Sequence, residues 1–300
     1  MNEATLFQSR SRFRPLSLPQ LLSDVADVAE FCAKNAANID HCGALPIEEF
    51  DRIAKAGLLI APLKPEFGGL GLGIQSEMLP VLLSILQQIG RSNLAIGRIY
   101  EGHVNALQLV QTFGTKAQIA AFADDVIDRH KIFGVWNAEA NDGVKLFPSD
   151  QTCRIEGSKT FCSGTGLVDR PFVNGALPDG GWQMAIVPME EVATVSDPSW
   201  WQPLGMRATA SFKVDFTGVE LNPNLLLGEA GDYFRQPWLS AGVVRFAAVQ
   251  LGGAEALFDA TRNYLQELGR TQDPYQAERL GKMAIAVESG NLWLQGAADR

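Results

Sequence analysis

The period of the hydrophobic pattern changes twice along this chain and divides its 300 residues into three parts. Up to residue 130, apolar residues recur at three- and four-residue steps, which is typical of amphipathic helices. Between residues 131 and 222, apolar and polar residues alternate, and beyond residue 231 the helical period returns. We therefore expect an α+β multidomain protein with an N-terminal all-α domain (1–130), a middle antiparallel β-barrel or β-sandwich domain (131–222) and a C-terminal helical bundle (223–300).

Individual elements can be predicted from caps, glycines and alternation. Helices are expected between Pro46 and Gly57, over a mostly apolar stretch from Ser76 to Phe113, and over 116–129 after the N-cap Thr115. Strands are expected over Ile132–Glu139, Thr152–Phe161, Phe172–Ala176, Trp182–Met189 and Ser211–Leu221. A long bundle helix is expected to carry one apolar stripe, which a partial bundle would leave underburied: Leu239, Val243, Phe246, Gln250, Ala254, Leu257, Thr261 and Leu265.

Composition excludes several classes of protein. Lys and Arg total 25 against 34 Asp and Glu, and this net charge of −9 disfavours nucleic acid or an anionic membrane as a partner. No apolar run reaches the roughly 20 residues that cross a bilayer. The four cysteines have no CxxC spacing and the three histidines form no HExxH motif, so we expect reduced thiols, a cytoplasmic location and no metal site.

Several short segments carry a family resemblance. The glycine-rich segment 65–71, the strand segment 157–164, the segment 204–211 with its Gly-Met-Arg, and the loop 224–229 follow one another in the order seen in the acyl-CoA dehydrogenase superfamily, which the whole chain resembles. The resemblance implies a helical domain, a β domain and a helical bundle, with FAD as the cofactor. It also implies a homodimer or homotetramer formed through the bundle and a small-molecule substrate, an acyl-CoA thioester.

The resemblance also assigns roles to particular residues. By position, Asn137, Ala138, Phe161 and Ser163 would contact the flavin, and Glu101, His103 and Arg245 would line the substrate cavity. Read from the residues alone, His103 fits an interior histidine and Glu101 fits an ion pair with Arg98 on the same helix. Arg245 needs a partner, since an unpaired buried charge is costly.

The chain departs from the family pattern in two places. Ala138 stands where the family has a flavin-contacting threonine, and Val244 stands at one of the two positions of the catalytic glutamate. The other position would lie beyond Arg300, so the catalytic residue is left unassigned and the helical bundle is expected to be partial in this chain.

Three functions remain open at this point. The leading one is α,β-dehydrogenation of an acyl thioester, with hydride transfer to flavin N5. A flavin-dependent monooxygenase on the same scaffold is the alternative, favoured by the loss of threonine at Ala138 and by a possible His103–Ser163 pair. The third is a non-catalytic flavin-binding relative.

Overall fold

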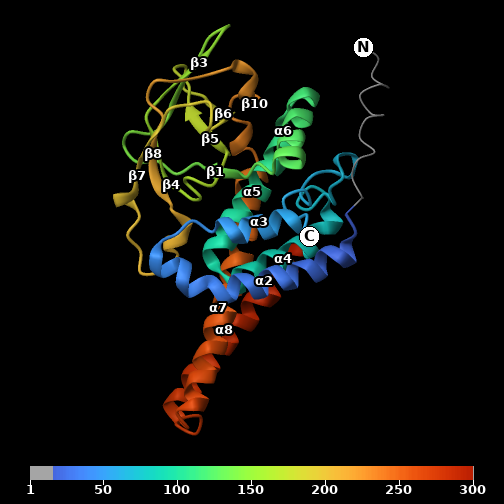
Figure 1. Ribbon diagram of the computed structural model, residues 1–300, viewed down its shortest axis with the longest axis vertical. Helices are drawn as coiled ribbons and strands as arrows, with labels where there is room; N and C mark the ends of the chain where they lie inside the picture. Colours follow the sequence, from blue (N-terminus) through green and yellow to red (C-terminus); the bar gives the residue numbers. More distant parts are fainter. Residues whose placement is uncertain (1–15, 300) are drawn as a thin grey trace.

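The computed structural model describes residues 16–299, which form a helical layer, a β domain and a projecting pair of helices (Figure 1). The helices of the first layer are α2 (Leu18–Cys42), α3 (Ile47–Lys55), α4 (Leu79–Ser92), α5 (Leu94–Phe113) and α6 (Lys116–Arg129). Short 3-10 turns are η1 (Pro65–Phe67), η2 (Ser76–Met78), η3 (Pro198–Trp200), η4 (Arg207–Thr209), η5 (Pro223–Leu225) and η6 (Asp232–Phe234). The α+β organisation expected from the hydrophobic periods is confirmed.

The apolar stretch predicted as helical from Ser76 to Phe113 is interrupted near its centre. Asn93 has extended backbone angles, and its side chain accepts hydrogen bonds from the amides of Ala95 and Ile96. An asparagine in this geometry satisfies free amides at a helix start, so α4 ends and α5 begins here. As predicted, Thr115 caps α6, and Gln118 completes a capping box.

The β domain consists of two sheets. Its strands are β1 (Phe133–Trp136), β2 (Lys145–Pro148), β3 (Cys153–Glu156), β4 (Ser158–Cys162), β5 (Arg170–Ala176), β6 (Trp182–Ile186), β7 (Val195–Asp197), β8 (Phe212–Asp215), β9 (Val219–Leu221) and β10 (Leu226–Leu227). One sheet has the order β10-β6-β5-β2-β3-β9, with β1 also paired to β5, and the other has the order β4-β8-β7. This is a sandwich and not a closed barrel. It is also not purely antiparallel, because β1 and β2 both run parallel to β5.

Two predicted strands are each divided at a glycine. Thr152–Phe161 contains β3 and β4, which belong to different sheets, and Gly157 between them has a φ of 93°. Ser211–Leu221 contains β8 and β9, with Gly218 at a φ of 83°. A left-handed φ is open to glycine at little cost, so the chain turns from one sheet to the other at these positions. Alternation of apolar residues cannot reveal such a crossing.

The last two helices form an antiparallel hairpin that extends away from the rest of the molecule (Figure 1). They are α7 (Trp238–Glu267) and α8 (Pro274–Ala298). The predicted stripe on α7 is underburied as expected, since Leu239, Val243, Phe246 and Leu257 are exposed in this structure. The side of α7 that packs on α4 and α5 instead carries Arg245, Ala248, Val249 and Gly252.

Small residues explain which side of α7 is buried. A Cβ atom at Gly252 would collide with the backbone of Gln87 on α4, and one at Gly90 would collide with the backbone of Val249. The two helices therefore approach each other closely at these glycines. Within residues 16–299, α7 alone has the length and hydropathy of a membrane-crossing helix, which is weak evidence for one because its buried side includes Arg245.

Candidate active site

An exposed aromatic ring marks one edge of the β domain. Phe161 is 51% exposed and has a φ of 53°, at a point where the register of β4 against β8 shifts. Its ring meets Trp200 and Trp201 edge-on, at 6.1 and 6.2 Å between centroids. Left-handed backbone is unfavourable for a residue with a side chain and persists where the surroundings hold it. The fold thus presents a flat aromatic surface to solvent on an otherwise buried strand.

A chain of hydrogen-bonded hydroxyl groups begins two residues after Phe161, at Ser163. The Oγ atoms of Ser163 and Ser211 are 2.9 Å apart, Ser211 Oγ donates to Thr209 Oγ1, and Thr209 Oγ1 donates to the carbonyl of Met206. Each hydroxyl has one proton to donate. Because Thr209 and Ser211 have committed theirs, Ser163 must donate to Ser211, and Ser163 Oγ remains open only as an acceptor.

A buried lysine holds the segment after β1 against β4. Lys159 is fully buried, and its Nζ donates to the carbonyl of Asn137 at 3.1 Å and to Glu139 Oε2 at 2.6 Å. Burial lowers the pKa of Lys159, against the opposing effect of Glu139. The amide of Thr160 donates to the carbonyl of Ala138, which places the exposed Ala138 next to Phe161 along the same edge. Sequence reasoning missed Lys159, although it stands two residues before Phe161.

Helix α5 joins this edge to the helical layer. A Cβ atom at Gly164 would touch the side chain of Ile99, and one at Gly102 would lie near the backbone of Gly134 and Val135 on β1. Residues of α5 that face α7 are therefore separated from the β domain by the width of one helix.

On the α7 side of α5 lies a cluster of three charged residues and one asparagine, all buried except the partly exposed Arg98, which we call the α5/α7 charge cluster: Arg98, Glu101, Asn105 and Arg245. Glu101 Oε2 accepts from Arg98 Nη1 at 3.0 Å, and Arg245 Nη2 donates to Asn105 Oδ1 at 2.7 Å. Arg245 Nε lies 3.5 Å from Glu101 Oε1, and neither atom has a hydrogen-bond partner. The predicted Arg98–Glu101 ion pair is confirmed. Burial lowers the pKa of Arg245, and Glu101 acts in the opposite direction.

His103 lies outside both groups. Its Nδ1 accepts from the amide of Phe133 at 3.0 Å, so its Nε2 carries the proton and donates to the carbonyl of Leu59 at 2.9 Å. The ring is fully buried, and burial lowers the pKa of His103 to about 4. The predicted His103–Ser163 pair is therefore wrong, because both ring nitrogens are used by backbone groups and Ser163 pairs with Ser211 instead.

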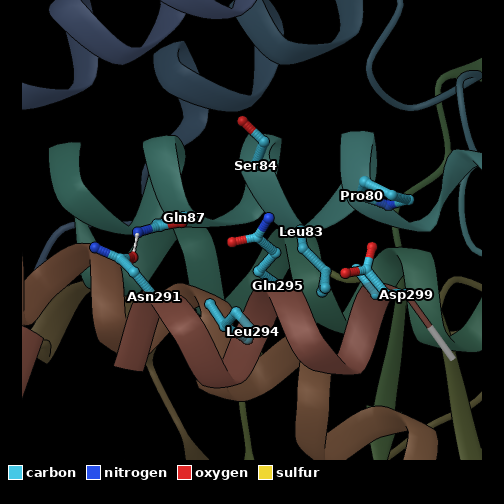
Figure 2. Close-up of a pocket in the computed structure, with 9 residues that line it drawn as sticks. Pro80, Leu83, Ser84, Gln87, Asn291, Leu294, Gln295 and Asp299 are labelled. Carbon is cyan, nitrogen blue, oxygen red and sulfur yellow. Dashed lines mark hydrogen bonds between the residues drawn. The ribbon is translucent and has the colours of Figure 1, made fainter. Parts of the chain in front are cut away.

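Three of the hollows within residues 16–299 are lined by several polar residues. Figure 2 shows one between α4 and α8, with Leu83 and Leu294 at its wall and Gln87 Nε2 donating to Asn291 Oδ1 at 2.8 Å. None of the residues predicted to bind flavin or substrate lines it. A second, of about 330 Å³, lies beside Glu139 and Trp182. A third, of about 250 Å³, lies between α5, α7, α8 and residues 73–79, and Arg245 lines it.

Comparison with known proteins supports the family resemblance of the chain. Residues 20–129 match the model of the acyl-CoA dehydrogenase N-terminal domain. Over 283 residues, the chain is 26% identical to the short-chain-specific acyl-CoA dehydrogenase of Clostridium acetobutylicum, covering 88% of this chain and 73% of that one. The resemblance to the acyl-CoA dehydrogenase superfamily is confirmed.

Two further proteins with different names are similar to this chain. Dibenzothiophene monooxygenase of Rhodococcus erythropolis is 24% identical over 299 residues, which is 90% of this chain and 70% of that one. The solved structure of butyryl-CoA dehydrogenase from Megasphaera elsdenii superposes with a TM-score of 0.81 at 21% identity, over 95% of this chain and 80% of that one. The chain therefore has the acyl-CoA dehydrogenase fold, which is shared by proteins named for two different reactions.

Proposed function

We propose that the chain belongs to a flavin-dependent oxidoreductase and that the exposed edge of β4 receives the flavin ring. The observation that carries this proposal is the exposed, left-handed Phe161, which stands next to Ala138 and two residues before Ser163. A planar aromatic ligand gains most from such a surface, since stacked and edge-on rings attract each other beyond their buried area. We expect FAD, with FMN as the alternative to be compared.

The residues at the exposed edge of β4 are suited to hold a flavin ring. Ser163 Oγ is available as an acceptor for a ring N–H, and Lys159 fixes Asn137 and Glu139 on the other side of Phe161. A bound flavin would supply the hydride or electron transfer that amino acid side chains do not perform. The chain itself would bind and orient the ring and restrict water around it.

Between the two reaction types, the α5/α7 charge cluster favours a monooxygenase. Glu101, the acidic residue expected at the substrate cavity, is held by Arg98 and Arg245. A cavity that contains buried charges suits a polar substrate better than an alkyl chain. The similarity to dibenzothiophene monooxygenase supports the same reading.

Dehydrogenation of an acyl thioester is the second candidate. It is supported by the similarity to the short-chain-specific acyl-CoA dehydrogenase and by the Phe161–Ser163 segment. In either case we expect a small-molecule substrate, a cytoplasmic location and a homodimer or homotetramer. The exposed apolar residues of the α7–α8 hairpin, such as Val243, Leu257 and Trp293, support self-association.

Visible spectroscopy of the purified chain with FAD or FMN tests the proposal. Phe161→Ala should weaken flavin binding about tenfold, the loss expected for one aromatic contact. Tyr275→Ala removes an exposed aromatic ring on α8 and should leave binding unchanged. Equal affinities for the wild-type chain and Phe161→Ala, or no flavin bound at all, would contradict the site.

The reaction type is tested on the same samples. Bleaching of the bound flavin by butyryl-CoA without oxygen would establish dehydrogenation. A flavin that stays oxidised with butyryl-CoA, but after chemical reduction transfers oxygen from O₂ to an aromatic or sulfur-containing compound, would establish the monooxygenase.

A further inference from the structure

The hollow between α5, α7, α8 and residues 73–79 combines an arginine with neutral polar groups. Its volume is about 250 Å³, and its lining includes Gln75, Ser76, Leu79, Gln108, Val244 and Arg245. This volume lies at the small end of ligand sites, so it suits a group of few atoms.

Arg245 is incompletely paired although it is almost fully buried. Its side chain is 2% exposed, one guanidinium nitrogen donates to Asn105, and Nε–H has no hydrogen-bond partner. A buried donor without an acceptor is rare in folded proteins and is costly when it belongs to a charged group. Arg245 also lines the hollow, so an incompletely paired guanidinium group borders this space.

The α5/α7 charge cluster also has an excess of positive charge. Arg98 and Arg245 share a single carboxylate, Glu101, and the third partner of the cluster, Asn105, is neutral. Removing an ion from water costs several kcal/mol unless an opposite charge and hydrogen bonds compensate. One additional anion would balance the cluster, and arginine binds oxyanions through paired N–H groups.

We propose that this hollow binds the anionic group of a small organic substrate, a carboxylate or a sulfur oxyanion, with Arg245 as the charged partner. Gln108 and Gln75 would provide neutral hydrogen bonds, and Leu79 and Val244 would contact the short carbon chain. The assignment of this anion as a substrate rests on the proposed flavin function. The binding itself does not, because no residue of the hollow belongs to the flavin edge.

The test measures binding to the chain without flavin. Isothermal titration and thermal unfolding are carried out with butanoate, butanesulfonate and neutral butanamide at one ionic strength. We expect either or both anions to bind and to raise the unfolding temperature, and butanamide to have no effect. The two anions together identify which oxyanion is preferred. Equal stabilisation by butanamide, or no binding by either anion, would overturn the proposal.

Two variants locate the site. Arg245→Met should abolish anion binding, and Gln108→Leu, which leaves the charge cluster intact, should weaken it about tenfold, as expected for one lost hydrogen bond to a charged group. Gln266→Leu, an exposed glutamine further along α7, is the matched control. If Arg245→Met does not fold, Gln108→Leu decides, and unchanged binding there contradicts the site. Flavin titration of the same variants separates this outcome from failure of the proposed function.

Discussion

Ser163 Oγ lies 2.9 Å from Ser211 Oγ, and this contact joins β4 to the segment that leads into β8, 48 residues later in the chain. The hydrogen-bond direction along Ser163, Ser211 and Thr209 is fixed by the carbonyl of Met206 at its end. The proposed flavin edge is therefore built from two distant segments, and the acceptor character of one hydroxyl is determined by the other segment.

This relationship separates two serine variants. Ser163→Ala removes the acceptor and should weaken flavin binding about tenfold. Ser211→Ala keeps the Ser163 hydroxyl and should change flavin affinity by no more than about threefold, although both variants lose about 1 kcal/mol of stability. Flavin fluorescence titration and urea unfolding measure the two effects. Equal losses of affinity in both variants would show that Ser163 acts only as part of the packing.

Removing the carboxylate from the α5/α7 charge cluster should strongly destabilise the fold. Glu101→Gln leaves the buried Arg245 and the partly exposed Arg98 beside a neutral amide, and breaking a buried pair in this way costs about 3–5 kcal/mol. Glu30→Gln breaks the exposed Glu30–Lys34 pair on α2 and should leave the free energy of unfolding nearly unchanged. Urea unfolding of both variants gives the comparison. Similar small effects would mean that Glu101 is not needed to balance the arginines.

The ion pair between Arg170 and Glu190 should make the free energy of unfolding depend on pH in the acidic range. The hydrogen bond from Arg170 lowers the pKa of Glu190 to about 2, so the stabilisation is present above the ordinary glutamate range and is lost as pH falls toward 2. Because Glu190 is partly exposed, we expect only about 1 kcal/mol between pH 5 and pH 2. Glu190→Gln should remove this part of the pH dependence in urea unfolding. Glu191→Gln, on the exposed neighbouring residue, should retain it.

The break between α4 and α5 gives a prediction about a single cap. Asn93→Ala removes the acceptor for two amides of α5 and should cost about 1 kcal/mol, whereas Asn93→Asp keeps an acceptor and should be nearly neutral. Urea unfolding measures both. If Asn93→Ala is as stable as the wild-type chain, packing and not the cap fixes the start of α5.

Much of the fold follows from local signals in the sequence. Thr115 and Gln118 form the capping box of α6 within four residues, and such a signal needs no knowledge of the rest of the chain. The packing side of α7 could not be predicted in the same way. Apolar residues mark two sides of that helix, and the choice is made by Gly252, which meets the backbone of α4 far away in the sequence.

The candidate site also contains some residues that could be predicted from the sequence and others that could not. Phe161, Ser163 and Ala138 were predicted by position within a resemblance, and the structure places them along one edge, where their role in flavin binding stays a proposal. Ser211 and Lys159 were not predicted to take part. Their contacts depend on the pairing of β4 with β8 and on the depth of burial, which no short motif expresses.

The close approach of α4 and α7 at Gly90 and Gly252 has a consequence for ligand choice. Gly252 follows Arg245 by two turns of α7, or ~10 Å along the helix axis. Because a helix moves largely as a rod, any side chain at either glycine would displace α7 and carry the guanidinium away from Asn105 and Glu101. Substrate preference in this protein would then depend on two positions, Gly90 and Gly252, that touch no ligand and carry no functional group. Relatives with identical lining residues but bulkier residues at these two positions would be expected to select different compounds.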